Sequence, residues 1–284
     1  MSTLSRTTTP ARTRIRFRVS WIGLVVVGLV FAVPFYWMIS SAFKPESEIY
    51  QWPLQFVPSR LAWENFSNAW NAVPFGDFFV NSLIVTIVGA TAKVTLAVFS
   101  AYAFAFLPFP GKKWIFLAVL GALMVPGHVT LLLNYITIGN LGMINTYAGI
   151  ILPGLASAFG TFLLRQHFLS LPKEVMEAAE LDGAGHIRKL FYFALPMSVP
   201  AVVTVALIAV IDEWNDFIWP LLVTNSVQMR TLPIGLMALK ESEGVDNWGA
   251  IMAGTTMVVL PMLLLFLFAQ RFIVAGLAGA SVRR

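Results

Sequence analysis

FFVNSLIVTIVGATAKVTLAVFSAYAFAFL, residues 78–107, is the stretch that decides the fold class. It is apolar almost throughout and carries a single charged side chain, Lys93. A helix rises 1.5 Å per residue, so one of this length exceeds the roughly 30 Å hydrocarbon core of a bilayer. The stretch therefore predicts a membrane-spanning helix that tilts or extends beyond the bilayer.

The composition of the whole chain agrees with a membrane protein. Of its 284 residues, 58% are hydrophobic and 12% are charged, whereas soluble domains carry about 25% charged residues. The net charge of +5 comes from short basic clusters between apolar runs. Such clusters are typical of topology signals and do not indicate nucleic-acid binding. The absence of cysteine excludes disulfides and thiolate metal sites.

Five further apolar stretches are long enough to cross a bilayer, since a span needs about 20 mostly apolar residues. We therefore predict an all-α polytopic membrane protein with six transmembrane helices. The predicted spans are residues 20–43, 78–107, 113–132, 147–169, 199–223 and 249–275.

The distribution of Lys and Arg predicts the direction of these spans. Most of the 19 basic residues lie before the first span, after the sixth, or between spans two and three and spans four and five. Because cytoplasmic segments carry an excess of Lys and Arg, both termini are predicted to be cytoplasmic. The predicted divisions are a disordered basic N-terminus (1–19), a six-span membrane domain (20–275) and a cytoplasmic tail (276–284). The opposite side holds only Lys44, Arg60, Arg230 and Lys240.

The connection between the fourth and fifth spans, residues 170–196, is the most polar part of the cytoplasmic side. Its first helix is predicted to start near Pro172, which the first turn of a helix tolerates. Gly183 and Gly185 break that helix, and a second amphipathic segment runs to Pro196. A helix–glycine–helix hairpin of this kind suits docking into a groove of another protein. The residues alone leave an ordinary interfacial loop as the alternative.

The order of residues in this hairpin resembles the EAA signature of ABC importer permeases. The matching pattern is Glu-Ala-Ala, three residues, glycine, nine residues and Phe-Ala-Leu-Pro, with Phe193 where the family has isoleucine. In that family the loop forms coupling helices that sit in a cleft of each ATP-binding subunit. The resemblance implies this ATPase-coupling role here for Glu177, Ala178, Ala179, Asp182, Gly183, Leu195 and Pro196.

The resemblance extends over most of the chain and concerns the maltose-type sugar permeases. Trp-Asn-Asp-Phe at 214–217 resembles their fifth span, and Gln-Arg-Phe at 270–272 resembles their C-terminal end. Within that family the glycerol-3-phosphate branch is the most similar. The final Arg283 and Arg284 depart from the family's ending.

The resemblance also implies partners, a location and a function. The expected partners are a second homologous permease, two ATP-binding subunits, an extracytoplasmic solute-binding protein and membrane lipid, without nucleic acid. The expected location is the prokaryotic plasma (inner) membrane. The implied function is import of a sugar or sugar-phosphate-like solute, glycerol 3-phosphate or a glycerophosphodiester, with a di- or oligosaccharide as the alternative.

No nucleotide-binding or catalytic motif occurs in the sequence. Gly111 and Lys112 lack the glycine five positions earlier that a P-loop requires, the three histidines are scattered, and no serine nucleophile elbow is present. We therefore predict no enzyme activity and no cofactor in this chain. ATP and Mg²⁺ are expected to bind to the partner ATPase subunits.

Charged residues inside predicted spans need a partner or a polar cavity, because charge is costly in a bilayer. We expect Lys93 to face a carboxylate such as Asp212 or Glu213, or an anionic substrate. The i, i+4 spacing places Asp212 and Asp216 on one face of the predicted fifth span. These charges form either a translocation path or structural pairs. The candidate substrate path comprises Lys93, Asp212, Glu213, Trp214, Asn215 and Asp216.

Two other function classes compete with an importer permease. An ion-coupled secondary transporter would use the same charges, and discontinuous helices in related positions of two repeats would favour it. No such pair is evident in the sequence. A membrane-embedded enzyme would need a catalytic constellation, which the sequence does not supply.

Overall fold

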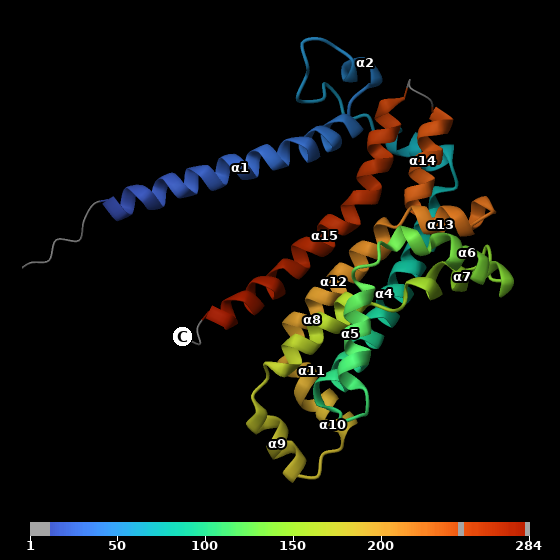
Figure 1. The fold of residues 1–284 in the computed structure, drawn as a ribbon. Helices are drawn as coiled ribbons and strands as arrows, with labels where there is room; N and C mark the ends of the chain where they lie inside the picture. The colour runs from blue at the N-terminus through green and yellow to red at the C-terminus, as the bar shows by residue number, and fades with distance from the viewer. Residues whose placement is uncertain (1–11, 244–246, 282–284) are drawn as a thin grey trace, which may run out of the picture.

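The computed structural model describes residues 12–243 and 247–281, and every regular element within them is a helix (Figure 1). The predicted all-α class is therefore confirmed. In chain order the elements are α1 (Arg12–Ala42), α2 (Glu46–Ile49), α3 (Glu64–Ala72), α4 (Phe75–Phe106), α5 (Lys112–Ala122), η1 (Gly127–Thr130), α6 (Leu131–Asn140), α7 (Tyr147–Ile151), η2 (Leu152–Gly154), α8 (Ala158–Leu169), α9 (Lys173–Leu181), α10 (His186–Lys189), η3 (Leu190–Ala194), α11 (Leu195–Met197), α12 (Val199–Asn215), α13 (Ile218–Val223), η4 (Val227–Met229), α14 (Leu232–Glu243) and α15 (Trp248–Ser281).

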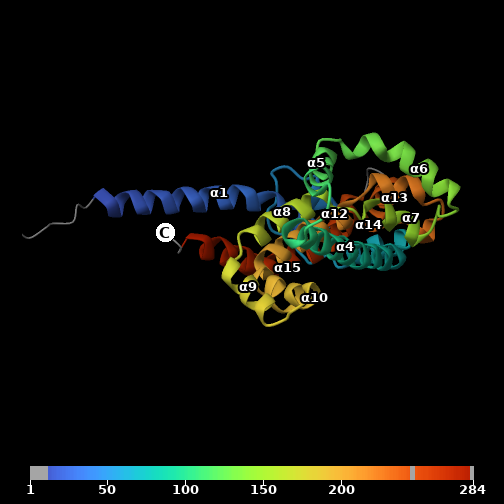
Figure 2. The ribbon, with the colours of Figure 1, turned by 60° about the horizontal axis from the view of Figure 1, so that its bottom comes forward.

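Helix α4 lies at the centre of the molecule and is unbroken, as the sequence predicts. Small side chains allow α8 and α12 to approach it closely. A Cβ added to Gly160 of α8 would lie 3.1 Å from the Cβ of Ala97 in α4 and 3.0 Å from Val205 in α12. Ser100 and Thr161 add a hydrogen bond of 2.8 Å between α4 and α8. Helices α4, α8 and α12 therefore form one tightly packed core (Figure 2).

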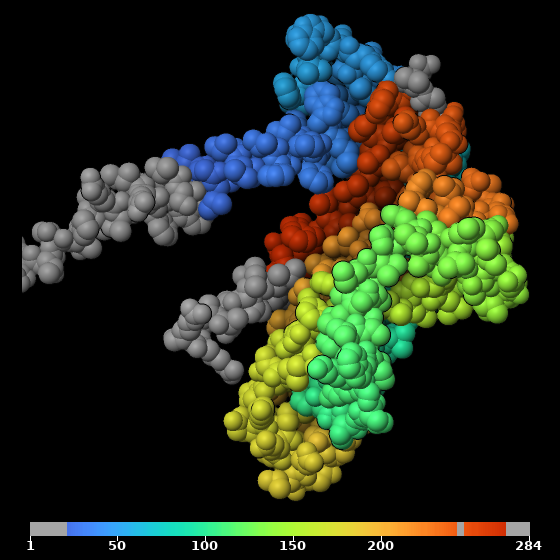
Figure 3. Space-filling model, viewed as in Figure 1, coloured from blue at the N-terminus to red at the C-terminus, as the bar shows by residue number. Residues whose placement is uncertain are grey.

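Helix α1 extends away from the rest of the molecule as a long arm (Figure 1). Its stretch Ile22–Ala42 has a mean hydropathy of 2.3, and none of its most apolar window is buried. The contact with the body lies at one end of the arm, where Ala42 packs with Ala250 and Ala253 of α15. Away from this contact α1 and α15 diverge (Figure 3). An apolar surface of this length, unburied within the chain, is typical of a helix that faces lipid or another subunit.

Within the described residues, three helices are long and apolar enough to cross a bilayer: Ile22–Ala42, Phe75–Phe106 and Trp248–Gln270. Three further pairs of consecutive helices are long and apolar enough only when the two helices of a pair are counted together. The angles between the two helices of these pairs are 94°, 47° and 85°. The chain thus offers three spans, or up to six if each bent pair crosses once. Six spans with cytoplasmic termini stay a prediction.

The predicted third and fourth spans are wrong as continuous helices. In the third, α5 ends at Ala122 and the chain bends by 94° before η1, next to Pro126 and Gly127. In the fourth, Pro153 and Gly154 lie in the short turn η2 between α7 and α8. Proline removes a helical hydrogen bond and glycine weakens a helix, so each Pro-Gly pair interrupts an apolar run.

The boundaries at both ends also differ from the prediction. The sequence predicts disorder over residues 1–19, whereas α1 begins at Arg12; residues 1–11 lie outside the described part. Arginine is a good helix former with a long side chain, so it extends a helix beyond its apolar run. The sixth span is predicted to end at residue 275, but α15 continues to Ser281.

The predicted hairpin, residues 170–196, lies at the end of the molecule opposite α2 and α14 (Figure 1). Its first helix is α9, and Gly183 follows with a φ of +73°, as a glycine turn requires. The second segment runs through α10, η3 and α11 and ends at Met197, one residue after the predicted end at Pro196. The chain then bends by 85° before α12, which begins at Val199.

Candidate functional site

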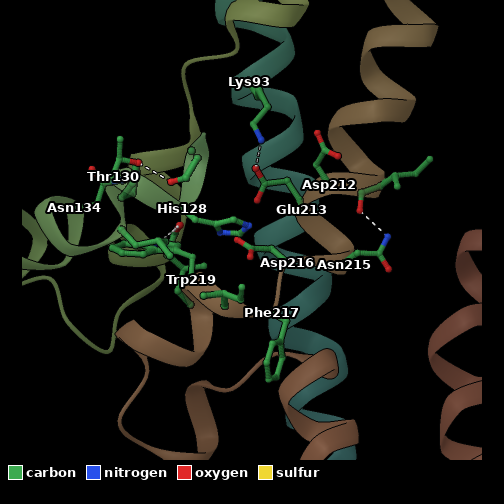
Figure 4. Close-up of a pocket in the computed structure, with 17 residues that line it drawn as sticks. Lys93, His128, Thr130, Asn134, Asp212, Glu213, Asn215, Asp216, Phe217 and Trp219 are labelled. Carbon is green, nitrogen blue, oxygen red and sulfur yellow. Dashed lines mark hydrogen bonds and ion pairs between the residues drawn. The ribbon is translucent and has the colours of Figure 1, made fainter. Parts of the chain in front are cut away.

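A cavity of 920 Å³ lies where α4 and α12 meet the broken helices around them (Figure 4). α4 and α12 supply one part of its wall, and η1, α6, α7, η2, α13 and the connection between α12 and α13 supply the rest. Its charged and polar lining includes five of the six candidate residues of the substrate path. Those five are Lys93, Asp212, Glu213, Asn215 and Asp216.

An ion pair between Lys93 of α4 and Glu213 of α12 crosses this part of the core. Lys93 Nζ lies 2.7 Å from Glu213 Oε1, and the two side chains are 15% and 10% exposed. Figure 4 shows the two side chains pointing toward each other. Of the partners predicted for Lys93, the structure selects Glu213. Asp212 forms no ion pair with any residue in the described part of the chain.

Two glycines provide the space for this ion pair. A Cβ added to Gly89, one turn before Lys93 in α4, would lie 2.9 Å from the Glu213 carboxyl carbon, so the Glu213 carboxylate would have to move from its present position. A Cβ on Gly154 would lie 3.7 Å from Glu213 Oε1 and 4.0 Å from Lys93 Nζ. Gly89 is therefore required by the position of the Glu213 carboxylate, and Gly154 forms an ordinary contact surface beside it.

The predicted fifth span, residues 199–223, is interrupted at the cavity. α12 ends at Asn215, Asp216 has extended backbone, and α13 begins at Ile218. Asp216 follows the last residue of α12, and its side chain lines the cavity. Asp212 and Asp216 face the same cavity as predicted, but not along one continuous helix. Irregular backbone at membrane depth is tolerated where it lines such a cavity.

Trp214 does not line the cavity, although the sequence places it in the candidate path. It is buried and points toward α15, where its indole N–H donates a hydrogen bond of 3.2 Å to the carbonyl of Val258. Phe79 of α4 contacts it edge-on. Trp214 therefore joins α12 to α4 and α15. Its neighbour Asn215 lines the cavity but donates its amide to the carbonyl of Ile211 at 2.8 Å.

Several cavity residues were not predicted from the sequence. His128, Thr130 and Asn134 enter from η1 and α6, after the bend in the predicted third span. His128 and Thr130 lie within the predicted third span, residues 113–132. The Pro-Gly pair at 126–127 was the available signal, since it marks a turn that exposes polar side chains to a cavity.

The hairpin forms a second candidate site, and its exposed face carries most of the predicted coupling residues. Glu177, Ala178 and Asp182 are exposed, as is Gly183, while Ala179 is buried against the rest of the hairpin. Leu181, at the end of α9, is 89% exposed. An apolar side chain so exposed beside acidic neighbours is typical of a protein-binding surface.

The hairpin is closed on itself by an ion pair. Lys189 Nζ lies 3.0 Å from the carboxylate of Glu180, and the Lys189 side chain is buried whereas that of Glu180 is exposed. The hydrogen bond from Lys189 holds the pKa of the Glu180 carboxyl below its ordinary value. The pair therefore fixes α9 relative to α10 at neutral pH.

Apolar contacts fix the hairpin to the core helices. Met176 of α9 and Leu190 of η3 belong to the same buried cluster as Tyr102 of α4 and Phe168 of α8. Leu195 packs on this cluster from the side, and Pro196 is exposed. α4 therefore connects the hairpin, through Tyr102, with the ion pair at Lys93 in one unbroken helix.

The described part of the chain contains no candidate metal-binding site. No group of three or more His, Asp or Glu side chains there could hold a metal ion. The three carboxylates of the cavity, Asp212, Glu213 and Asp216, are thus available to pair with Lys93 or to accept hydrogen bonds from a solute.

Comparisons with known proteins agree with this architecture. One relative is the probable ABC transporter permease protein YurM of Bacillus subtilis (strain 168), 37% identical over 93% of this chain and 87% of that protein. The sn-glycerol-3-phosphate transport system permease protein UgpE of Yersinia pestis bv. Antiqua (strain Antiqua) is 32% identical over 92% of this chain and 95% of that protein. The arabinooligosaccharides transport system permease protein AraQ of Halalkalibacterium halodurans is 34% identical over 93% and 96%.

Solved structures show the same fold. A chain of a bacterial ABC transporter involved in the import of the acidic polysaccharide alginate superimposes with a TM-score of 0.79 at 19% identity, covering 93% of this chain and 99% of that one. The names of the three relatives describe permease proteins of transport systems. Residues 7–279 match the family described as binding-protein-dependent transport system inner membrane component, and the chain therefore belongs to that family, among its sugar ABC permeases.

Proposed function

We propose that the chain is the permease subunit of an importer that moves a sugar or sugar-phosphate-like solute into the cell, driven by ATP hydrolysis in partner subunits. The observation that carries this proposal is the continuity of α4. The same helix packs against the hairpin at Tyr102 and holds the cavity ion pair at Lys93. A movement of the hairpin therefore reaches the cavity through one rigid element.

The proposed partners are a second homologous permease, two ATP-binding subunits and an extracytoplasmic solute-binding protein. The exposed face of α9, with Glu177 and Leu181, supports an ATPase contact. The unburied arm α1 supports a second membrane subunit. ATP and Mg²⁺ would bind to the ATPase subunits, because this chain carries no P-loop.

The proposed mechanism is alternating access without bond chemistry in this chain. When the ATPases close on ATP, the hairpins move with them. The core of α4, α8 and α12 then moves as a body, since Met176 and Leu190 are packed into it. The Lys93–Glu213 ion pair keeps α4 and α12 together during that motion. Such rigid-body motion shifts the population between outward- and inward-facing states.

Two solute classes have equal support from the relatives. The name of one relative indicates glycerol 3-phosphate and that of another indicates arabinooligosaccharides, at similar identities.

An ion-coupled secondary transporter is the second candidate function, because α12 and α13 are discontinuous beside buried charges. The family match favours the importer.

Co-purification tests the proposal most simply. An affinity-tagged chain, expressed in its native host, should retain an ATP-binding subunit through mild detergent purification. Leu181→Asp on the exposed tip of α9 should lose that subunit, whereas Gln51→Asp on the opposite side of the molecule should keep it. Recovery of the chain alone, with no ATP-binding subunit under any mild detergent, would contradict the proposal.

A further inference from the structure

Most hydrogen-bond donors of the cavity are already used by the protein itself. Lys93 donates to Glu213 at 2.7 Å. The indole N–H of Trp219 donates to the carbonyls of Gly149 and Ile150 at 3.2 and 3.0 Å. Among the described residues that line the cavity, Lys93 is the only lysine or arginine. No unpaired lysine or arginine therefore remains among these residues for an anionic solute.

Two polar side chains of the lining also donate to the protein itself. The Asn215 amide donates to the carbonyl of Ile211 at 2.8 Å, and Thr130 donates its hydroxyl to the carbonyl of Gly127 at 2.9 Å. His128 and Asn134 are further polar side chains of the lining.

Acceptors, by contrast, are in excess. Asp212 and Asp216 face the cavity, and neither forms an ion pair in the described part of the chain. Ionised carboxylates accept hydrogen bonds and donate none. Figure 4 shows Asp212, Glu213 and Asp216 gathered on one side of the cavity. With ordinary ionisation states, three carboxylates face the single Lys93, so the formal charge of the Lys, Asp and Glu side chains that line the cavity is negative.

We propose that this cavity admits an uncharged, polyhydroxylated carbohydrate and excludes phosphate-bearing solutes such as glycerol 3-phosphate, a proposal that rests on the importer function above. Each sugar hydroxyl can donate to Asp212 or Asp216 in a charge-assisted hydrogen bond. Phe217 and Trp219 also line the cavity and add apolar surface to it. A phosphate only accepts hydrogen bonds and is negative, so it meets repulsion and few free donors.

The cavity charge makes the two solute classes respond oppositely to substitution. Asp212→Asn removes a negative charge and a strong acceptor but breaks no ion pair, so the complex should assemble normally. It should weaken binding of the carbohydrate and tighten binding of glycerol 3-phosphate. Glu213→Gln also releases Lys93 as a free cation, and its effect on glycerol 3-phosphate should be larger.

The test measures equilibrium binding to the complete detergent-purified complex without its solute-binding protein, by scintillation proximity. Without the solute-binding protein, the measured selectivity is that of the membrane complex alone. The probes are radiolabelled maltotriose, radiolabelled arabinotriose and radiolabelled glycerol 3-phosphate. We expect one of the two trisaccharides to bind at least about tenfold more tightly than glycerol 3-phosphate, and Asp212→Asn to reduce that ratio by about tenfold. The matched carboxylate-to-amide control is Glu64→Gln on α3, which is exposed outside the cavity and should leave the ratio unchanged.

Three results would overturn this proposal. They are equal binding of glycerol 3-phosphate and the trisaccharides, a ratio that Asp212→Asn does not change, and binding of none of the probes. Each of them leaves the importer function standing if the same complex retains its ATPase subunits. Loss of the ATPase subunits from the wild-type complex would instead contradict the proposed function.

Discussion

Lys93 Nζ and Glu213 Oε1 lie 2.7 Å apart, and this contact joins α4 to α12 beside the cavity. Both helices are also joined to the hairpin, α4 through the buried cluster around Tyr102 and α12 through α11. A movement of the hairpin would therefore move α4 and α12, and with them the ion pair and the cavity wall beside it.

Loss of one member of this pair should destabilise the complex. Lys93→Met leaves the carboxylate of Glu213 shielded from water and without its cation, which costs about 3–5 kcal/mol in buried pairs. We expect a lower melting temperature and less assembled complex in size-exclusion chromatography. The double variant Lys93→Met/Glu213→Gln should recover assembly, because it removes the stranded charge.

The matched control for that rescue is Lys93→Met/Asp212→Asn. Asp212 is adjacent in sequence but is not the partner of Lys93, so this double variant should stay as unstable as Lys93→Met. Rescue by Asp212→Asn and not by Glu213→Gln would mean that the pairing is wrong.

Gly89→Ala should disturb the same pair without removing a charge. The new Cβ would lie 2.9 Å from the Glu213 carboxyl carbon, and overpacking of this kind costs about 1–3 kcal/mol. The readout is the melting temperature of the purified complex. Gly28→Ala in α1 is the control, since a Cβ there meets no atom within 4 Å. Equal melting temperatures for the two alanine variants would argue against the close packing of α4 on Glu213.

The glycine turn of the hairpin should be needed for ATPase binding and not for membrane insertion. Gly183 has a φ of +73°, and a Cβ there meets no atom within 4 Å, so the cost of Gly183→Asp comes from backbone conformation and added charge. Left-handed backbone costs a residue with a Cβ about 1–2 kcal/mol. We expect normal membrane levels with reduced ATPase co-purification, and the same for Glu177→Lys, which reverses a charge on the exposed face.

Gly185→Ala supplies the control for the hairpin. Its backbone φ is −65°, which alanine adopts readily, and its Cβ would also meet no atom within 4 Å. This variant should retain ATPase co-purification. Normal ATPase binding and normal solute-stimulated hydrolysis in Gly183→Asp and Glu177→Lys would remove the hairpin from the coupling mechanism.

The direction of the chain in the membrane is open to a labelling test, because the chain has no cysteine of its own. Cysteines introduced singly at Leu181 and Ser281 should resist a membrane-impermeant thiol reagent in intact cells, since the charge distribution predicts both in the cytoplasm. A cysteine at Gln228, which is exposed beyond α13, should react. Labelling of Leu181→Cys from outside would reverse the predicted orientation.

The parts of the fold that sequence reasoning predicted are those that depend on local chemistry. Helix α4 follows from an uninterrupted apolar run, and the hairpin turn follows from Gly183, whose positive φ few other residues adopt. The pairing of Lys93 with a fifth-span carboxylate follows from the cost of an isolated charge in a bilayer.

The parts that were missed depend on contacts between distant segments. Hydropathy averages over a window, so it does not register the bends near Pro126 and Pro153 or the break at Asp216. The need for glycine at position 89 comes from Glu213, which is remote in sequence. The sequence places Trp214 in the candidate path, but its indole N–H donates to the carbonyl of Val258 and the side chain lies toward α15.

The most direct test of the whole account is ATP-dependent uptake by the purified importer in proteoliposomes. Radiolabelled trisaccharide and the solute-binding protein are supplied outside, with ATP or a non-hydrolysable analogue enclosed. The account predicts accumulation with ATP, none with the analogue, and no change when an ionophore dissipates ion gradients. Accumulation that needs an ion gradient and proceeds without ATP would contradict it, and would make the chain an ion-coupled transporter.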